Sequence, residues 1–492
     1  MMGRQPDPQP KLFYTRLNLE KRIRQDHVLR KIAQLIDFDF IYNQVQDTYG
    51  TNGNVSVPPP VILKMMLLLV LYNVRSEREL MQTIPERLDW LWFLGYDLDD
   101  PVPNHSVLSK ARNRWGSDAF KFFFESIVAQ CVDAGLVEGS KIFVDASLVQ
   151  ADASNNSVVN QQSLKRYLNK SYCELERRLE QQPESEPKTG AANRKFISTT
   201  DPDASVVRVG PGRSKLRYKV HRAVDEKHEV ITATEVSAGE KNEAHLLTDL
   251  IDEHQALTGE SVKTAVADSK YGTIENYLAC CDRQIAPHFE SFNKGHQGSG
   301  KRKGIFAPSD FVYNPDEDVF VCPAGEVLER RKFKKKRSHF EYSLPKKICN
   351  QCRLKSQCTR SKHGRTLKRH LRQQDLDRML GQSRSSAARK DIRLRQSLME
   401  RSFARSKRYG YKRARWRRRW RVRIQEYVTA AIQNIMVLVR YGKEQGAAAE
   451  ARKARPRPKR SLFVARLLKL SQLAAQSLNR LTMIPLKTAI RH

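Results

Sequence analysis

Cysteine is scarce in this chain, and none of its hydrophobic runs is long enough to cross a membrane. Eight cysteines among 492 residues are too few for the disulfide framework of a small secreted domain. The most hydrophobic run, 61–72, is only about a dozen residues long and contains Lys64, whereas a membrane-spanning helix needs about 20 residues. We therefore expect this run to form a buried helix. No signal peptide is recognised, so we expect a protein of the reducing cytoplasm with no membrane partner.

Acidic residues are few relative to basic ones. The chain has 88 Lys and Arg against 54 Asp and Glu, a net charge of +34, and a hydrophobic content of 40%. That content is ample for a buried core, and the length suits roughly two to four domains. A large positive charge opposes compaction and attracts polyanions. Nucleic acid is therefore the favoured partner, and an anionic membrane surface is the lesser alternative.

The first 138 residues are predicted to be helical, as an arm over 1–57 and a domain over 58–138. In the stretch 103–116, an Asn cap precedes a basic helix and a Gly ends it. This pattern resembles a helix-turn-helix and makes its cations candidate DNA contacts. A charged, solvent-facing side of a helical bundle would give the same pattern. The candidate residues are Lys110, Arg112 and Arg114.

Two aspartates, Asp145 and Asp268, each follow a short apolar run and precede a polar turn. Both runs are predicted to be strands that end in the acid. A third acid, Glu400, lies where apolar and basic residues recur at helical spacing. Any one of them alone could be an ordinary turn or cap residue. Together, the three carboxylates could converge on a pair of magnesium ions, the arrangement that cuts and joins phosphodiesters.

The order of predicted elements between residues 139 and 290 is three strands, a helix, a strand, a helix and a strand. This order predicts an α/β ribonuclease-H-like core, in which the fourth strand lies beside the first and places Asp145 next to Asp268. An insert is expected at about 153–216, with a helix near 164–179. A second, basic and Cys-rich insert follows at 291–385. The core resumes over 386–442 and ends in an apolar closing helix expected from Val428 to Tyr441. Residues 443–492 form a basic linker and a helix at about 462–481.

The second insert contains a cluster of cysteines that could bind zinc. Four thiolates within 37 residues fit a closed tetrahedral zinc site. The cluster has one leading cysteine where standard fingers have a pair, so free buried cysteines are the alternative. The four residues are Cys322, Cys349, Cys352 and Cys358.

The densest basic stretch spans residues 411–423, where eight of 13 residues are cationic and none is acidic. A solvated helix face normally mixes charges of both signs. Guanidinium groups pair with phosphates, and indoles stack on unpaired bases, so we expect this stretch to contact DNA. The residues concerned are Lys412, Arg413, Arg415, Trp416, Arg417, Arg418, Arg419, Trp420, Arg421 and Arg423.

Four short motifs make the chain resemble the DDE transposases of bacterial insertion sequences. They are Phe-Val-Asp-Ala-Ser at 143–147, Ser-Thr-Thr-Asp-Pro-Asp-Ala at 198–204, Val-Ala-Asp-Ser-Lys-Tyr-Gly-Thr at 266–273 and Met-Glu-Arg-Ser-Phe-Ala at 399–404. They occur in the order of that family, and the likeness extends from about residue 103 to about 441. Each motif is weak alone, and the ordered set is specific.

The resemblance implies that Asp145, Asp268 and Glu400 are catalytic carboxylates that bind Mg²⁺ or Mn²⁺. It also implies a DNA transposase that cleaves insertion-sequence ends and transfers strands into target DNA. Its partner would be double-stranded DNA, held by a homodimer on paired ends. The alternatives are an inactive, transposase-derived DNA-binding regulator or a non-mobile DNA nuclease.

The sequence departs from the family pattern around the third acid. Lys407, seven residues after Glu400, matches the family lysine and is a candidate DNA contact. Arg393 and Gln396, however, stand where many relatives have Tyr and Arg. Whether Arg395 takes the place of that arginine is an open question at this point.

Overall fold

The computed structural model describes residues 2, 18–50, 54–160, 190–289 and 304–452. The chain divides into two units, residues 1–442 and 443–492. The described part of the second unit is the end of helix α18 (Arg419–Arg452). The helices predicted near 164–179 and 462–481 lie outside the described residues.

The N-terminal region is helical, as predicted. Helix α4 (Pro59–Leu71) is the predicted buried helix, because all of its residues from Pro59 to Val70 are buried except Lys64. The Lys64 ammonium lies 5.4 Å from the ring centre of Phe38. Among the described residues, no helix is long and apolar enough to span a bilayer. The other helices here are α1 (Leu19–Arg22), α2 (Val28–Leu35), α3 (Phe40–Val45), α5 (Glu77–Thr83), α6 (Leu88–Leu94), α7 (Ser106–Trp115) and α8 (Asp118–Asp133).

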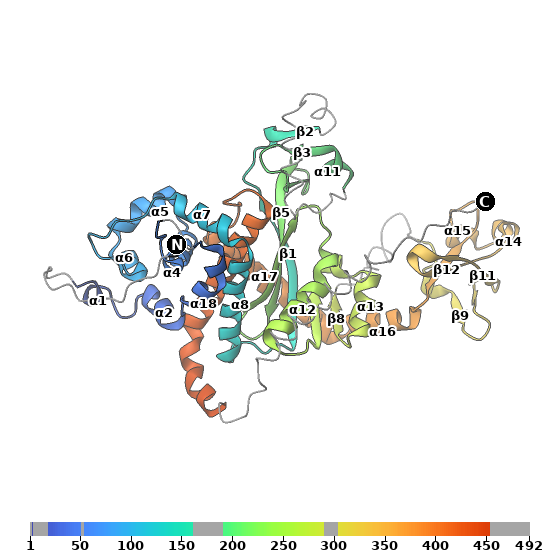
Figure 1. Cartoon of the computed structure of the whole chain (residues 1–492). Helices are drawn as coiled ribbons and strands as arrows, with labels where there is room; N and C mark the ends of the chain where they lie inside the picture. The colour runs from blue at the N-terminus through green and yellow to red at the C-terminus, as the bar shows by residue number, and fades with distance from the viewer. Residues whose placement is uncertain (1, 3–17, 51–53, 161–189, 290–303, 453–492) are drawn as a thin grey trace, which may run out of the picture. The chain divides into compact units, whose positions relative to one another are not determined.

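A mixed α/β core follows, built on a six-stranded sheet of order β4-β5-β1-β7-β8, with β6 paired to β5. Strand β1 runs antiparallel to β5 and parallel to β7, and β7 runs parallel to β8. Figure 1 shows β1 and β5 side by side in this sheet. The strands are β1 (Lys141–Gln150), β4 (Ser205–Val207), β5 (Lys215–Asp225), β6 (Ile231–Ala238), β7 (Thr264–Ala267) and β8 (Ala286–Phe289).

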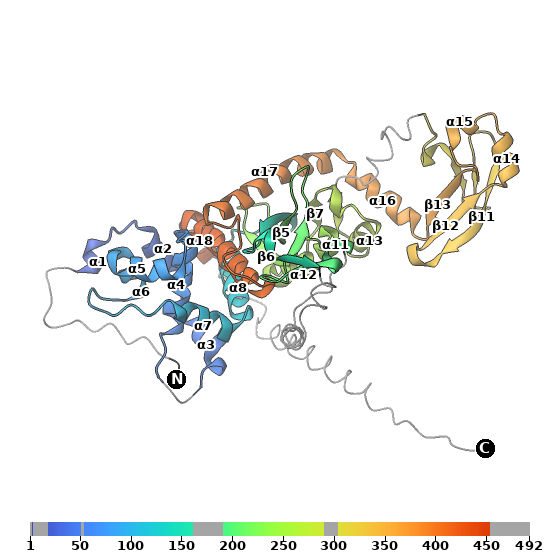
Figure 2. The same cartoon turned by 90° about the horizontal axis from the view of Figure 1, so that it is seen from above.

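Helices cover both faces of the sheet (Figure 2). On one face, α12 (Leu247–Thr258), α13 (Ile274–Asp282) and α16 (Gln373–Ser383) pack against Val144. On the other, α17 (Ser386–Arg408) and α18 pack against Phe143. Alternate residues of a strand point to opposite faces, so Asp145 lies on the α17 face.

A fully buried ion pair joins this sheet to α18. The guanidinium Nε of Arg222, on β5, lies 2.7 Å from Oε1 of Glu426, and both side chains are 0% exposed. Arg222 is directly opposite Asp145 in the β1–β5 ladder. It also donates to the backbone oxygen of Ser402 on α17 at 3.3 Å. The pair therefore links β5, α17 and α18 next to Asp145.

The structure corrects two predicted boundaries. Asp145 does not end its strand, because β1 continues to Gln150 and stays paired with β5. The polar residues after Asp145 resemble a turn in the sequence, yet they lie on a strand. The closing helix α18 was expected to begin near Val428 and begins at Arg419. Arginine is a good helix former, and a carboxylate oxygen of Asp203 accepts the Arg419 N–H at 3.0 Å, satisfying a terminal donor.

Two further segments interrupt the core. The first insert contributes β2 (Val158–Asn160), α11 (Ala191–Lys195) and β3 (Phe196–Ser198). Residues 304–371 form a five-stranded antiparallel sheet of order β13-β12-β11-β10-β9 around Leu328, Tyr342 and Leu367. The sequence analysis predicted a basic insert here and did not predict a sheet. Its elements are β9 (Val312–Asn314), β10 (Val319–Val321), β11 (Val327–Lys334), β12 (His339–Ser343), β13 (Thr366–His370), α14 (Lys346–Gln351) and α15 (Lys355–Cys358).

Candidate active site

Two of the predicted acids come from neighbouring parallel strands. The last parallel pair of β1 and β7 is Phe143 with Val266. Asp145 and Asp268 each stand two residues beyond this pair, in equivalent positions. Asp268 directly follows β7, and its Oδ1 accepts the backbone N–H of Lys270 at 2.9 Å. The strand register therefore brings the two aspartates together.

Glu243 is the third acid of this cluster, and sequence reasoning missed it. Ligand oxygens of Asp145, Glu243 and Asp268 all lie within 4.8 Å of one another, the single such group among the described residues. Glu243 begins a 3₁₀ turn after β6, and its side chain is only 6% exposed. Its Oε1 lies 3.1 Å from the ammonium groups of both Lys219 and Lys270. Its place after a strand is the signal that could have identified it.

Asp145 is held in a partly buried, highly charged setting. Burial raises the pKa of its carboxyl to about 6; Arg395 and the Ala146 N–H oppose this rise, and the charges of Asp268 and Glu243 add to it. The Arg395 Nη1 lies 2.5 Å from Oδ2 of Asp145. Arg395 thus occupies one oxygen of the acid that a cation would also use.

Glu400 lies on the exposed side of α17, outside this cluster of acids. Its Oε1 accepts a hydrogen bond from the Gln396 side chain at 3.3 Å. The helical location agrees with the sequence, but the described conformation does not bring Glu400 into the group formed by Asp145, Glu243 and Asp268. Arg393 is also exposed on α17.

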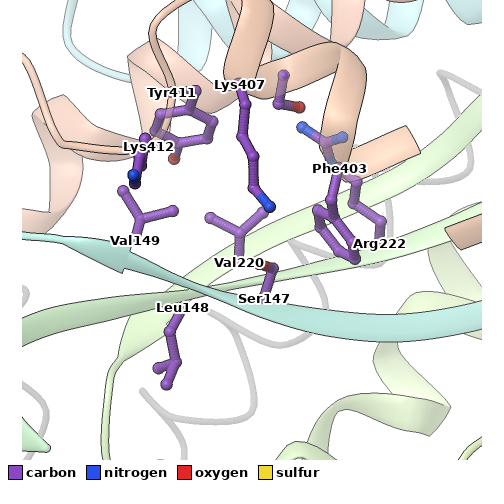
Figure 3. Close-up of a pocket in the computed structure, with 10 residues that line it drawn as sticks. Ser147, Leu148, Val149, Val220, Arg222, Phe403, Lys407, Tyr411 and Lys412 are labelled. Carbon is purple, nitrogen blue, oxygen red and sulfur yellow. The ribbon is translucent and has the colours of Figure 1, made fainter. Parts of the chain in front are cut away.

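Lys407 lies seven residues, or about two helical turns, after Glu400 on α17. It lines a small pocket on the sheet. Ser147 of β1 and Phe403 of α17 line the same pocket. Figure 3 shows the Lys407 side chain extending from its helix toward Ser147. Ser147 is two residues after Asp145 and lies on the same face of β1. The pocket therefore adjoins the cluster of acids along the strand.

Part of the basic stretch packs against the N-terminal helices. The indole N–H of Trp416 donates to Glu77 on α5 at 3.0 Å, and the Arg112 guanidinium lies 4.0 Å from the Trp416 ring centre. Arg112 is 4% exposed and also pairs with Glu77. Arg415 donates to Asn73 at 2.7 Å. In this conformation, these residues hold the helical region to the core.

Other cations of the stretch have acidic partners in the core. Arg413 and Arg417 pair with Asp152 at 2.9 and 3.3 Å, and Arg423 pairs with Glu235 at 2.5 Å. Further contacts join Arg418 to Asp203, Arg421 to Asn113 and Arg421 to the ring of Trp420. Arg419 is buried, whereas Lys412, Lys110 and Arg114 are exposed.

The four cysteines of the second insert lie near one another. Burial raises the pKa of the Cys358 thiol, Arg365 opposes the rise, and the charges of Cys349, Cys322 and Cys352 add to it. All four are partly buried and free of disulfides. In the part of the chain that the structure describes, no three of their sulfur atoms lie within 4.8 Å of one another.

Two family models match the chain. A transposase domain (DUF772) matches residues 17–114, which covers much of the helical N-terminal region. A transposase DDE domain matches residues 321–439, which includes Glu400, Lys407 and the basic stretch. No curated protein matches the chain, and no solved structure does.

Proposed function

This chain belongs to the DDE transposases of the insertion-sequence type, and we propose that it cleaves DNA at the ends of its element and joins them to target DNA. The observation that carries the proposal is the convergence of Asp145, Glu243 and Asp268 within 4.8 Å. The strand order β6-β5-β1-β7-β8 supports a ribonuclease-H-like core. Such a core delivers acids from adjacent strands to one point.

The residues present fit a site for divalent ions. Carboxylate oxygens are the ligands that Mg²⁺ and Mn²⁺ prefer, and three of them converge here. We propose Asp145, Asp268 and Glu243 as ligands in the described conformation, with Glu400 as the further acid that the family resemblance implies. Four carboxylates would balance the charge of two divalent ions.

Metal ions bound there would activate water, and later a DNA 3′-hydroxyl, for in-line attack and would stabilise the leaving oxygen. The acids supply charge and geometry and form no covalent intermediate. Arg395 contacts Asp145, so its guanidinium would have to release an oxygen of the acid, and it could then bind a phosphate. Lys407, which extends toward Ser147 in the adjoining pocket, would hold a DNA phosphate close to the acids.

The partner we propose is double-stranded DNA bound by a homodimer on paired ends. Within the predicted DNA-contact set, exposure favours Lys110, Arg114 and Lys412, together with Arg413 and Arg417, which share one acid. Because Arg112 and Arg419 are buried, we propose that they stabilise the fold and do not contact DNA. We also propose that the four cysteines of the second insert hold one structural zinc ion, which would draw their sulfur atoms closer together than they lie in the described conformation.

The test is cleavage of duplexes taken from the DNA that flanks the coding sequence. Asp268→Asn should abolish cleavage and leave DNA affinity within about twofold, since the acid acts on the metal and not on DNA binding. Glu243→Gln and Glu400→Gln should each raise the Mg²⁺ concentration for half-maximal cleavage by at least about tenfold. Glu275→Gln, an exposed acid on α13, is the matched control. Cleavage by Asp268→Asn at near wild-type rate would refute the assignment.

A further inference from the structure

The β11–β13 part of the second sheet has one face that carries more cationic than acidic side chains. The strand register aligns Lys332 of β11, Glu341 of β12 and Lys368 of β13 in one row across the three strands. On the same face, the row to one side contains Lys334 with His339 and His370, and the row to the other side contains Glu329 with Ser343 and Thr366. The turn after β11 contains Lys335, Lys336 and Arg337. Leu328, Tyr342 and Leu367 pack on the opposite side as the small core.

The strands and turns that form this face carry an excess of positive charge. Residues 327–370 contain 16 Lys and Arg against two acids, and the sheet region 304–371 as a whole contains 16 against seven. Glu341, the one acid in the row, lies 4.0 Å from the Lys334 ammonium. Lys332, Lys335, Lys336, Arg337 and Lys368 are exposed, and none of them forms an ion pair within the part of the chain that the structure describes.

This situation is the reverse of that in the 411–423 stretch. There, Arg417 and Arg423 are paired with Asp152 and Glu235, so binding a phosphate would require breaking an existing contact. On the insert, all of these cations except Lys334 are exposed and have no ion pair with another described residue, so a phosphate meets them without that competition. Ammonium groups on the surface of a sheet offer contacts to phosphates and do not read base edges.

We propose that this face, formed by Lys332, Lys334, Lys335, Lys336, Arg337 and Lys368, is a sequence-independent docking surface for the DNA duplex backbone. The proposal rests on the DNA substrate of the proposed function and adds a surface separate from the acids. Each phosphate contact releases bound counterions from DNA. Affinity contributed by this face is therefore predicted to depend steeply on salt and weakly on sequence.

The experiment compares the salt dependence of DNA binding by the full chain and by a triple variant, Lys332→Gln with Lys335→Gln and Lys368→Gln. Fluorescence anisotropy with a labelled duplex of arbitrary sequence gives the affinity at a series of salt concentrations. Three lost contacts should lower the log–log slope by about 2.7. Between 50 and 200 mM salt, wild-type affinity should then fall about 40-fold more than that of the variant.

A matched control removes three exposed arginines that already have acidic partners: Arg24→Gln, Arg283→Gln and Arg378→Gln. They pair with Asp26, Asp252 and Asp375. This variant loses the same net charge, so a slope change confined to the lysine variant supports direct contact. Circular dichroism melting shows that both variants are folded.

Equal slopes for the two variants would overturn the proposal. It would also be overturned if the lysine variant lost binding to phosphatidylglycerol vesicles and kept the wild-type DNA slope. Cleavage of flanking duplexes by the wild type in Mg²⁺, measured in parallel, separates the two ideas. Wild-type cleavage with an unchanged slope would reject the surface alone, whereas a reduced slope without wild-type cleavage would reject the proposed activity alone.

Discussion

Neutralising Asp145 should stabilise the metal-free protein, and the gain should depend on pH. Burial is the first cause that raises the pKa of this carboxyl from 3.8 to about 6. The folded state therefore disfavours the carboxylate form. This free-energy cost is absent at pH values below the pKa of Asp145 in the unfolded state. It is complete at pH values above the pKa of Asp145 in the folded state. A shift of this size lowers the free energy of unfolding by about 3 kcal/mol at pH 7 and by about 1 kcal/mol at pH 4.5.

Asp145→Asn removes the titrating group and keeps the shape of the side chain. In EDTA, urea titrations followed by tryptophan fluorescence should show the variant to be more stable than the wild type, by these two amounts at the two pH values. Added Mg²⁺ should raise the stability of the wild type and reduce the gap. Glu275→Gln serves as the control for removing an exposed carboxylate. A gap that is equal at both pH values, or a variant that is less stable at pH 7, would refute the reasoning.

Two further predictions concern the insert and the basic stretch. Metal analysis of purified protein should find about one zinc per chain, and Cys349→Ser should release it with a fall in the melting temperature; a folded, active, metal-free preparation contradicts this. Trp416→Ala should lower the stability of the protein by roughly 2 kcal/mol, because the indole packs under Arg112 and bonds Glu77. Weaker binding to single-stranded ends with unchanged melting would instead indicate a base-stacking tryptophan.

The sequence carried enough information for the elements that bring Asp145 and Asp268 to the site. Each follows an apolar run with strand periodicity, and such runs reflect local burial on a sheet. The buried helix α4 was equally plain, since apolar residues occupy nearly all of its positions. These features depend on neighbours in the sequence, which is why pattern reasoning detects them.

Other features depend on partners that are distant in the sequence. Glu243 joins the site only because the turn after β6 packs against the turn after β7, as its contact with Lys270 shows. Trp416 and Glu77 are 339 residues apart, and Arg417 and Asp152 are 265 apart. Composition suggested a free basic surface in that stretch, and only the fold shows which of its charges already have partners.

The buried Arg222–Glu426 pair restricts where α17 can lie along the sheet, because its hydrogen bonds depend on direction as well as on distance. A guanidinium binds a carboxylate in a fixed planar geometry, and the same guanidinium donates to the Ser402 backbone oxygen. Sliding α17 by one turn would break that bond and move Arg395, Glu400 and Lys407 by about 5.4 Å along the sheet. Apolar side-chain packing alone would tolerate such a shift of the helix far better, because dispersion contacts have no preferred direction. The pair thus fixes which turn of α17 lies opposite Asp145.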